Sequence, residues 1–185
     1  MEEKKQSINA VKMVVLVAIG AALYGLGGMI GIPIFANTTF KPAMAILALF
    51  AGAWGPVVGF LVGFLGHGIT DLFMGWGVWP TWMLGSGLVG IGIGLYPKLT
   101  NHSFDEGIFS TKNFVTFVIL AFISNFLGYL ISAILDYLIF TEPLNKVMTQ
   151  QILVAISNTL CIAVIGGPLM KLVANRNKTN SQILD

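Results

Sequence analysis

The chain has 185 residues, of which 56% are hydrophobic and 10% are charged, and its net charge is +2. Soluble domains carry about 25% charged residues, so this composition excludes an ordinary water-soluble domain and favours a membrane protein. The basic residues form no clustered face, which argues against a nucleic-acid partner. The single cysteine, Cys161, excludes an internal disulfide and a thiolate metal cluster, and we expect no metal ion and no cofactor.

Six apolar segments follow one another along the chain. Their unbroken hydrophobicity indicates helices rather than the alternating strands of a membrane barrel, and about 20 residues cross a hydrocarbon core of about 30 Å. The second segment is short for a span, so it must tilt, start in the preceding loop or stop before the far side. We expect a single integral membrane domain over 1–185, with a frayed polar tail over 175–185 and helices over 11–32, 42–54, 57–74, 78–96, 114–140 and 148–174.

The distribution of lysine and arginine predicts the orientation of these helices, because basic residues gather in cytoplasmic loops. With six helices and the N-terminus inside, only Lys41 and Lys146 fall outside. The other eight basic residues fall on the cytoplasmic side: Lys4, Lys5, Lys12, Lys98, Lys112, Lys171, Arg176 and Lys178. The predicted fold class is therefore all-α, a six-transmembrane-helix bundle with cytoplasmic N and C termini.

Polar side chains within the spans are candidate functional residues, because a polar group at membrane depth is costly. His67 and Asp71 are four residues apart in the 57–74 segment, so they share one helix face in its outer half. Together they offer donors and acceptors to a ligand. The alternative is a pair that only joins helices.

Three tryptophans, Trp76, Trp79 and Trp82, lie just past the outer end of that helix. Tryptophan gathers at membrane interfaces as an aromatic belt. Three within seven residues, next to His67 and Asp71, equally suit a stacking wall for a planar ligand. Both interpretations stay open.

A polar stripe follows one face of the 114–140 helix: Asn125, Tyr129, Ser132 and Asp136, at spacings of four, three and four. This face is expected to look into the bundle or into a wet cavity, and Asn158 on the last helix is expected to join it. Hydrogen bonding between helices is the alternative. With Asn37 from the outer connection 33–41, the three clusters converge on the outer half and predict a pocket open to the outside.

Small residues form two faces on which helices can approach closely. Ala18 and Ala22 provide one on the first helix, and Gly59, Gly63 and Gly66 provide a similar one on the third. Such a face serves either packing within the chain or docking of a partner membrane protein.

The sequence has no Walker A motif, so the chain does not itself hydrolyse ATP, and we expect no enzymatic activity. A six-helix bundle with a serine and a histidine invites comparison with a rhomboid protease, for which Ser86 and His67 are the candidates. That motif needs a glycine where Leu84 stands, and the helix order of the two residues is reversed.

Several short stretches of the second and third segments form a recognisable pattern: Lys41–Ala43, Leu49–Ala51, Trp54–Phe60, Gly63–Phe64, Gly66–His67 and Thr70–Asp71. This pattern resembles one known family, the substrate-binding S-components of energy-coupling-factor (ECF) transporters, and most closely the uncharacterised branch grouped with its riboflavin-type members. The likeness covers nearly the whole chain and is most specific over 42–90.

The resemblance implies a subunit of the bacterial plasma membrane that captures a vitamin or vitamin precursor from outside. Its partners are then a transmembrane coupling protein and two ATPase subunits, and Ala18 and Ala22 match the alanine motif that packs on the coupling protein. Riboflavin, cobalamin and thiamine-related pyrimidines are all open as substrates. The alternative function is a self-standing small-molecule channel or secondary carrier, which needs a polar path across both halves, whereas the inner halves here hold few polar groups.

Overall fold

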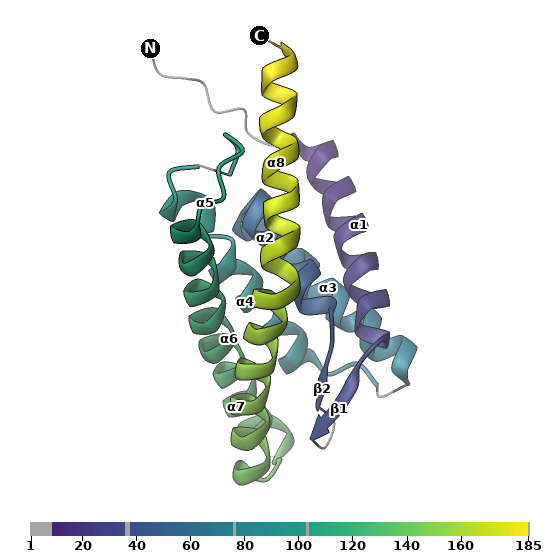
Figure 1. Ribbon diagram of the computed structural model, residues 1–185. Coiled ribbons are helices and arrows are strands. Elements are labelled where there is room, and N and C mark those ends of the chain that lie inside the picture. Colours follow the sequence, from purple (N-terminus) through teal and green to yellow (C-terminus); the bar gives the residue numbers. More distant parts are fainter. Residues whose placement is uncertain (1–8, 36–37, 76, 103, 185) are drawn as a thin grey trace.

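The computed structural model describes residues 9–35, 38–75, 77–102 and 104–184 and shows a helical bundle with one short β-hairpin (Figure 1). The hairpin corrects the all-α expectation: its two antiparallel strands occupy the outer connection between the first two predicted helices. The elements are α1 (Ala10–Met29), β1 (Ile32–Phe35), β2 (Thr38–Phe40), α2 (Ala43–Trp54), α3 (Pro56–Met74), α4 (Pro80–Ile93), α5 (Tyr96–Leu99), α6 (Thr111–Phe140), α7 (Leu144–Cys161), the π-helical turn η1 (Ile162–Gly166) and α8 (Gly167–Leu184).

Within the part of the chain that the structure describes, four helices are long and apolar enough to cross a membrane: α1, α3, α6 and the continuous helix from Leu144 to Thr179. The second and fourth predicted helices are shorter, with 12 residues in α2 and 14 in α4. The predicted count of six spans therefore depends on these two short helices and stays a prediction.

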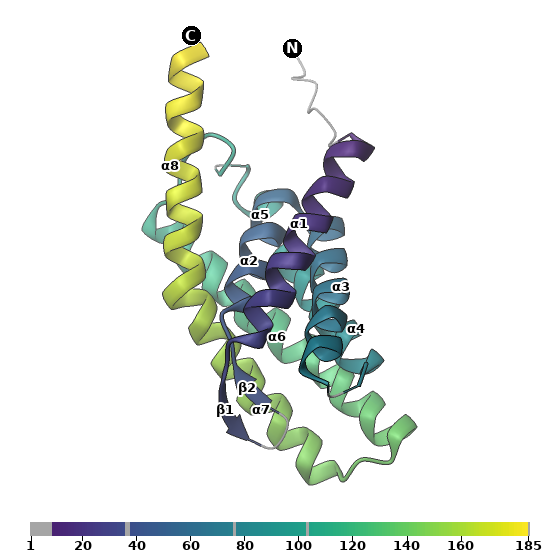
Figure 2. The same ribbon diagram turned by 90° about the vertical axis from the view of Figure 1, so that its right-hand side faces the viewer.

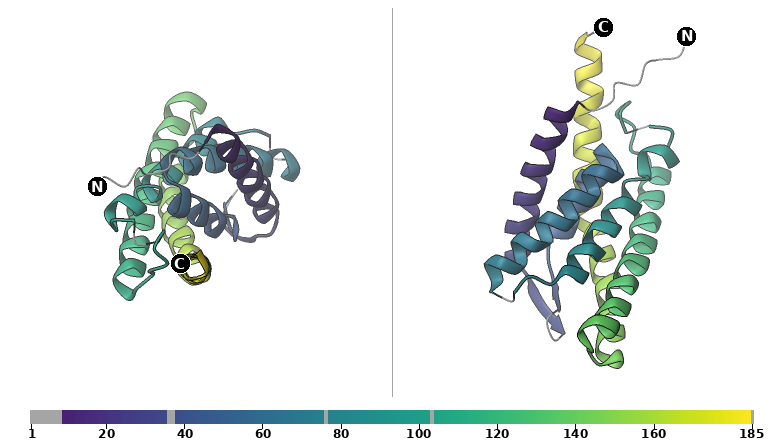
Figure 3. Two further views of the ribbon diagram at one scale, coloured as in Figure 1. Left: turned by 90° about the horizontal axis from the view of Figure 1, so that it is seen from above. Right: turned by 180° about the vertical axis from the view of Figure 1, so that it is seen from behind.

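Different structural elements lie at the two ends of the bundle (Figure 2). α1 begins and α8 ends at one end, here called the termini end. The hairpin, the α3–α4 connection and the α6–α7 turn lie at the opposite end, here called the hairpin end. Between them α1 packs on α3, α3 on α4, α4 on α6, and α6 on α7 (Figure 3).

The glycine face of α3 packs within this chain. A Cβ atom added at Gly59 or Gly63 would overlap the α4 backbone at Gly90 and Ser86, and one added at Gly66 would lie 2.7 Å from Cβ of Tyr24 on α1. Only hydrogen at these positions allows the close approach. This contact decides between the two alternatives for this face, and it brings the Ser86 side chain within reach of α3.

The small residues of α1 divide between two faces. Gly20, Ala21 and Gly25 are buried against the bundle, whereas Ala18 and Ala22 are exposed. The pair therefore remains available on the outside of the structure.

α7, η1 and α8 form one continuous helix whose π-turn packs on α2. The expectation of a frayed tail from residue 175 is wrong, because the helix continues to Leu184. The loop between α5 and α6 supports the first part of this extension. The Asn177 Nδ2 group donates to the Phe104 carbonyl at 3.2 Å, and Gly107 lies against Lys178.

Aromatic rings pack the termini end. The buried Phe117 ring lies edge-on to Tyr96, with 5.5 Å between centroids, and 6.2 Å from Phe109. Offset and edge-on ring pairs of this kind are favourable beyond their buried area, so this part of the core is stabilised by apolar packing.

Candidate ligand-binding site

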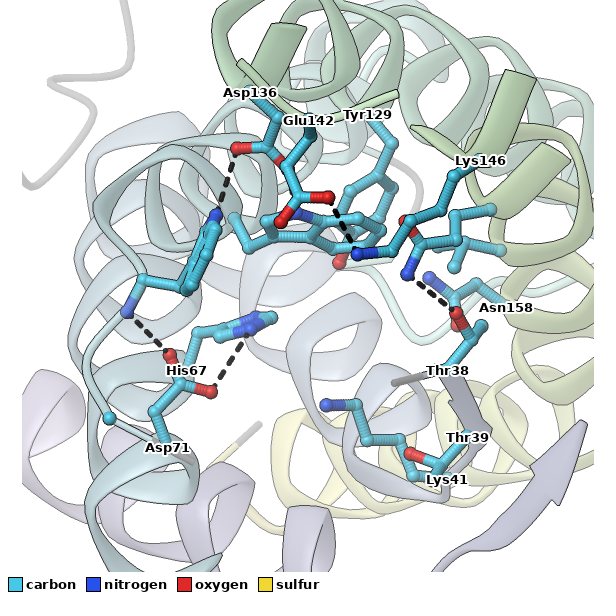
Figure 4. A pocket seen from close by; sticks show the side chains of 15 residues that line it. Thr38, Thr39, Lys41, His67, Asp71, Tyr129, Asp136, Glu142, Lys146 and Asn158 are labelled. Atoms are coloured by element: carbon cyan, nitrogen blue, oxygen red, sulfur yellow. Dashed lines mark hydrogen bonds and ion pairs between the residues drawn. The ribbon is translucent and has the colours of Figure 1, made fainter. Parts of the chain in front are cut away.

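A pocket of about 210 Å³ opens at the hairpin end, between β2 and helices α3, α4, α6 and α7 (Figure 4). Seven of the ten predicted ligand-binding residues line it, drawn from all three polar clusters. The lining residues are Thr38, Thr39, Lys41, His67, Asp71, Gly77, Trp79, Trp82, Tyr129, Asp136, Glu142, Lys146, Gln150, Val154 and Asn158. The predicted convergence in space is confirmed, while a role in ligand binding remains a prediction. Asn37 and Trp76 lie outside the described residues.

His67 is held in place from behind by a buried hydrogen-bond network. Its Nδ1 atom lies 2.6 Å from Oγ of Ser86, which in turn lies 2.8 Å from the Tyr129 hydroxyl and 3.4 Å from the Tyr24 hydroxyl. Ser86 has no exposed surface, and the close α3–α4 approach places it there. The network therefore fixes the ring orientation, and His67 rather than Ser86 faces the pocket.

Asp71 ties the α3–α4 connection back onto α3. One carboxylate oxygen accepts the backbone N–H of Trp79 at 3.1 Å, and the other lies 3.5 Å from Nε2 of His67. Asp71 therefore contacts His67, with which it shares a helix face as the spacing predicted, and also joins α3 to the segment that carries the tryptophans.

Asp136 holds the aromatic wall of the pocket. Its carboxylate accepts hydrogen bonds from the indole N–H groups of Trp79 and Trp82, at 2.9 and 2.6 Å, and from the Thr81 hydroxyl. Trp82 also lies 5.4 Å from the Tyr129 ring, centroid to centroid. These contacts fix both indole planes at the pocket, which favours the stacking wall over a membrane belt. They also occupy the carboxylate that the sequence suggested for the ligand.

Asn125 supports the pocket without lining it, which corrects its predicted position. Its side chain has no exposed surface; the amide donates to the Ala121 carbonyl at 2.8 Å, and its oxygen accepts from Nδ2 of Asn158 at 3.0 Å. The other predicted members of the α6 stripe are buried as their spacing required. Asn125 thus orients Asn158, which does face the pocket.

The hairpin side of the pocket contributes residues that the sequence did not single out. Lys41 follows β2, and its backbone carbonyl accepts the Cys161 thiol at 3.4 Å. Its side chain is only 9% exposed, and burial lowers its pKa, while Asp71 acts in the opposite direction. The Gln150 amide donates to Thr38 at 3.4 Å.

The α6–α7 turn contributes an ion pair at the rim, with Nζ of Lys146 2.6 Å from Glu142. Sequence spacing contained a usable signal for Gln150, which lies four and eight residues before Val154 and Asn158 and so shares their helix face. Among the described residues no group of three His, Cys, Asp or Glu side chains is placed to hold a metal ion.

Comparison with known proteins gives the family. The family model described as "ECF-type riboflavin transporter, S component" matches residues 8–175. A UPF0397 protein of Vibrio atlanticus (strain LGP32) is 54% identical over 176 residues, covering 94% of this chain and 97% of the relative. A UPF0397 protein of Lactococcus lactis subsp. cremoris (strain NZ9000) is 43% identical over 180 residues, covering 96% and 97%.

A solved structure described as "Structure and mechanism of the S component of a bacterial ECF transporter" aligns with a TM-score of 0.49 and 19% identity, covering 96% of this chain and 99% of that one. The family match spans most of the sequence and agrees with the long apolar helices. The chain therefore belongs to the ECF-type riboflavin transporter S-component family, as a multi-pass membrane subunit that binds a substrate for transport.

Proposed function

We propose that this chain captures a small planar vitamin or vitamin precursor from outside the cell and delivers it through an ECF-type importer in the bacterial plasma membrane. The observation that carries the proposal is the pocket at the hairpin end, whose lining includes His67 and Asp71 together with the indoles of Trp79 and Trp82. Fixed aromatic planes beside a few oriented polar groups are the usual composition of a small-molecule site.

The size of the pocket supports a compact ligand. A pocket of about 210 Å³ is suited to a ring system of modest size. A corrinoid is several times larger, whereas the ring system of a flavin or an aminopyrimidine is of suitable size. Since the matched family is described by riboflavin transport, riboflavin is the first ligand to test and cobalamin the last.

The proposed topology has six membrane crossings with both termini in the cytoplasm, so that the hairpin end faces outward. The start of α1 and the end of α8 lie at the same end of the bundle, which supports an even number of crossings, and the basic residues favour the inside for that end. The proposed partners are a transmembrane coupling protein and two ATPase subunits. The exposed Ala18 and Ala22 supply the face for the coupling protein.

A thermal-shift titration of the purified protein with riboflavin, thiamine, the hydroxymethyl-aminopyrimidine precursor of thiamine and cobalamin tests the ligand assignment. A ligand at 100 times its Kd stabilises the folded state by about 2.7 kcal/mol, which raises the Tm of a protein of this size by roughly 5–10 °C. We expect His67→Ala and Asp71→Ala to weaken the shift.

His102 and Asp105 provide the matched controls, because they form a similar histidine–carboxylate pair, at 3.4 Å, on an exposed loop of the termini end. His102→Ala and Asp105→Ala should leave the shift unchanged. No stabilisation by any ligand contradicts the pocket assignment. Uptake into sealed vesicles by this chain without ATPase subunits favours a self-standing carrier instead.

A further inference from the structure

Most charged groups in the pocket already have protein partners. Asp136 accepts three hydrogen bonds, Asp71 accepts the Trp79 N–H beside His67, and Glu142 pairs with Lys146. A carboxylate with its acceptor sites occupied has little capacity left for a ligand donor. The acidic residues of the pocket are therefore mainly structural.

Lys41 is the exception among the charged lining residues. Within the described ranges its ammonium group has no hydrogen bond and no ion pair, and Asp71 lies beyond ion-pair distance although its charge acts on the lysine. The side chain is 9% exposed. Figure 4 shows it reaching from the end of β2 into the cavity, opposite His67 and Asp71.

The position of Lys41 is fixed at its backbone, by the Cys161 contact to its carbonyl and by the start of α2 two residues later. The ammonium group therefore cannot leave the cavity by a large movement of the chain. A buried charge without a partner is strongly unfavourable, and apolar replacements of such groups are frequently stabilising. A ligand acceptor would remove that penalty.

We propose that Lys41 determines which ligands the pocket accepts, by donating to an acceptor oxygen of the bound molecule while the ring of that molecule lies against Trp82. The ligand class is a planar heterocycle with a carbonyl or carboxylate oxygen on one edge. A cationic heterocycle is excluded, because it would place a positive charge beside Lys41. This inference rests on the proposed transport function and adds the chemical class of its substrate.

The ligand-free protein gives the first test. Lys41→Met removes the unpartnered charge and keeps the length of the side chain, so we expect a higher Tm than for the wild type. Lys112→Met is the control, since Lys112 is exposed in the first turn of α6, and its Tm should not rise. A Tm for Lys41→Met that is equal to or lower than that of the wild type contradicts the inference.

Binding gives the second test, with riboflavin as the neutral carbonyl probe, nicotinate as the carboxylate probe and thiamine as the cationic probe. For the probe that binds, Lys41→Met should weaken the affinity by about 10–100-fold, the range for a hydrogen bond to a charged group. Lys41→Arg should retain more of the affinity. Lys112→Met, at an exposed lysine in the first turn of α6 and outside the pocket lining, should change it by less than about 3-fold.

The outcomes separate the two proposals. Binding of riboflavin or of nicotinate identifies the acceptor as a carbonyl or a carboxylate, and either result supports the inference when Lys41→Met weakens it. Strongest binding to thiamine, or an unchanged affinity of Lys41→Met, overturns the role of Lys41 and leaves the transport function intact. If none of these probes binds while the aminopyrimidine precursor or cobalamin stabilises the protein, the ligand class is wrong and the transport function stands. If none of those ligands stabilises it either, both proposals fail.

Discussion

The hairpin end and the termini end of this bundle are packed by different chemistry. At the hairpin end, buried polar side chains join α3, α4 and α6 around a cavity, as in the contacts of Ser86 and Asp136. At the termini end, the rings of Tyr96, Phe109 and Phe117 fill the space between helices. Ser86 and Asp136 are buried to the same extent as Tyr96 and Phe117. The contrast therefore shows that polar side chains gather around the cavity, and that burial alone does not decide where they lie.

The largest expected effect is on stability alone and leaves ligand binding unchanged. Phe117→Ala removes a fully buried ring at the termini end and should lower the free energy of unfolding by about 3–5 kcal/mol. The ligand Kd, measured at a temperature where the variant is folded, should not change. A higher Kd, which means weaker ligand binding, would show that the two ends are coupled and would contradict their separate roles.

Asp136→Ala is expected to affect both properties. It leaves three donors at the hairpin end without their acceptor, so the free energy of unfolding should fall by about 3 kcal/mol. Both indoles are then no longer held in place, so ligand binding should be lost. Tryptophan fluorescence should shift to longer wavelength. Asp136→Asn, which keeps one acceptor oxygen, should be intermediate, and Asp105→Ala on the exposed loop should be silent. A normal emission spectrum in Asp136→Ala would contradict the positioning role.

Ser86→Ala tests the buried network behind His67. The change removes one hydroxyl that contacts both His67 and Tyr129, so we expect a loss of about 1–2 kcal/mol in stability and weaker ligand binding through a displaced histidine. Ser157→Ala is the control, because that hydroxyl bonds only to its own helix at Val154. Equal effects of the two variants on Kd would show that the network does not position His67.

The smallest expected effect on stability concerns α1. Ala18→Trp combined with Ala22→Trp adds bulk to an exposed face, so the Tm and the ligand Kd should stay close to the wild-type values. Uptake in cells with the complete transporter should be blocked. Ile119→Trp, on an exposed position of α6, should not block it. Normal uptake by the α1 double variant would remove the docking face from the proposal.

Sequence periodicity predicted the parts of the site that lie on helices. The stripe of Asn125, Tyr129, Ser132 and Asp136 is buried, because a spacing of three and four residues fixes one helix face whatever the fold. The meeting of this stripe with His67 and the tryptophans was also predictable, since all of them fall in the same half of their helices.

Features that depend on partners across the fold were not predictable. The apolar residues around Ile32–Phe40 continue the hydrophobicity of α1, so the hairpin carried no strand pattern of its own. Lys41 is interpreted from the sequence as a marker of membrane orientation and as part of the family resemblance, and not as a pocket residue. The Asp136 carboxylate accepts hydrogen bonds from Trp79, Thr81 and Trp82. These bonds depend on side-chain geometry, which cannot be predicted from the spacing of residues.

The π-turn η1 has a consequence for the rotational phase of the last helix. Along α7 the residues Val147, Val154 and Cys161 are buried on one face. Leu172 follows Val154 by 18 residues, which is five full turns at 3.6 residues per turn, so an uninterrupted α-helix would turn Leu172 inward. Instead Leu172 is 65% exposed, and Met170 and Ala174 are fully buried.

The extra residue of the π-turn therefore rotates α8 by about one residue, or roughly 100° about its axis, relative to an uninterrupted α-helix. Deleting one residue from Ile162–Gly166 would reverse that rotation and withdraw Met170 from the core. One inserted residue thus determines which face of α8 packs against the rest of the bundle.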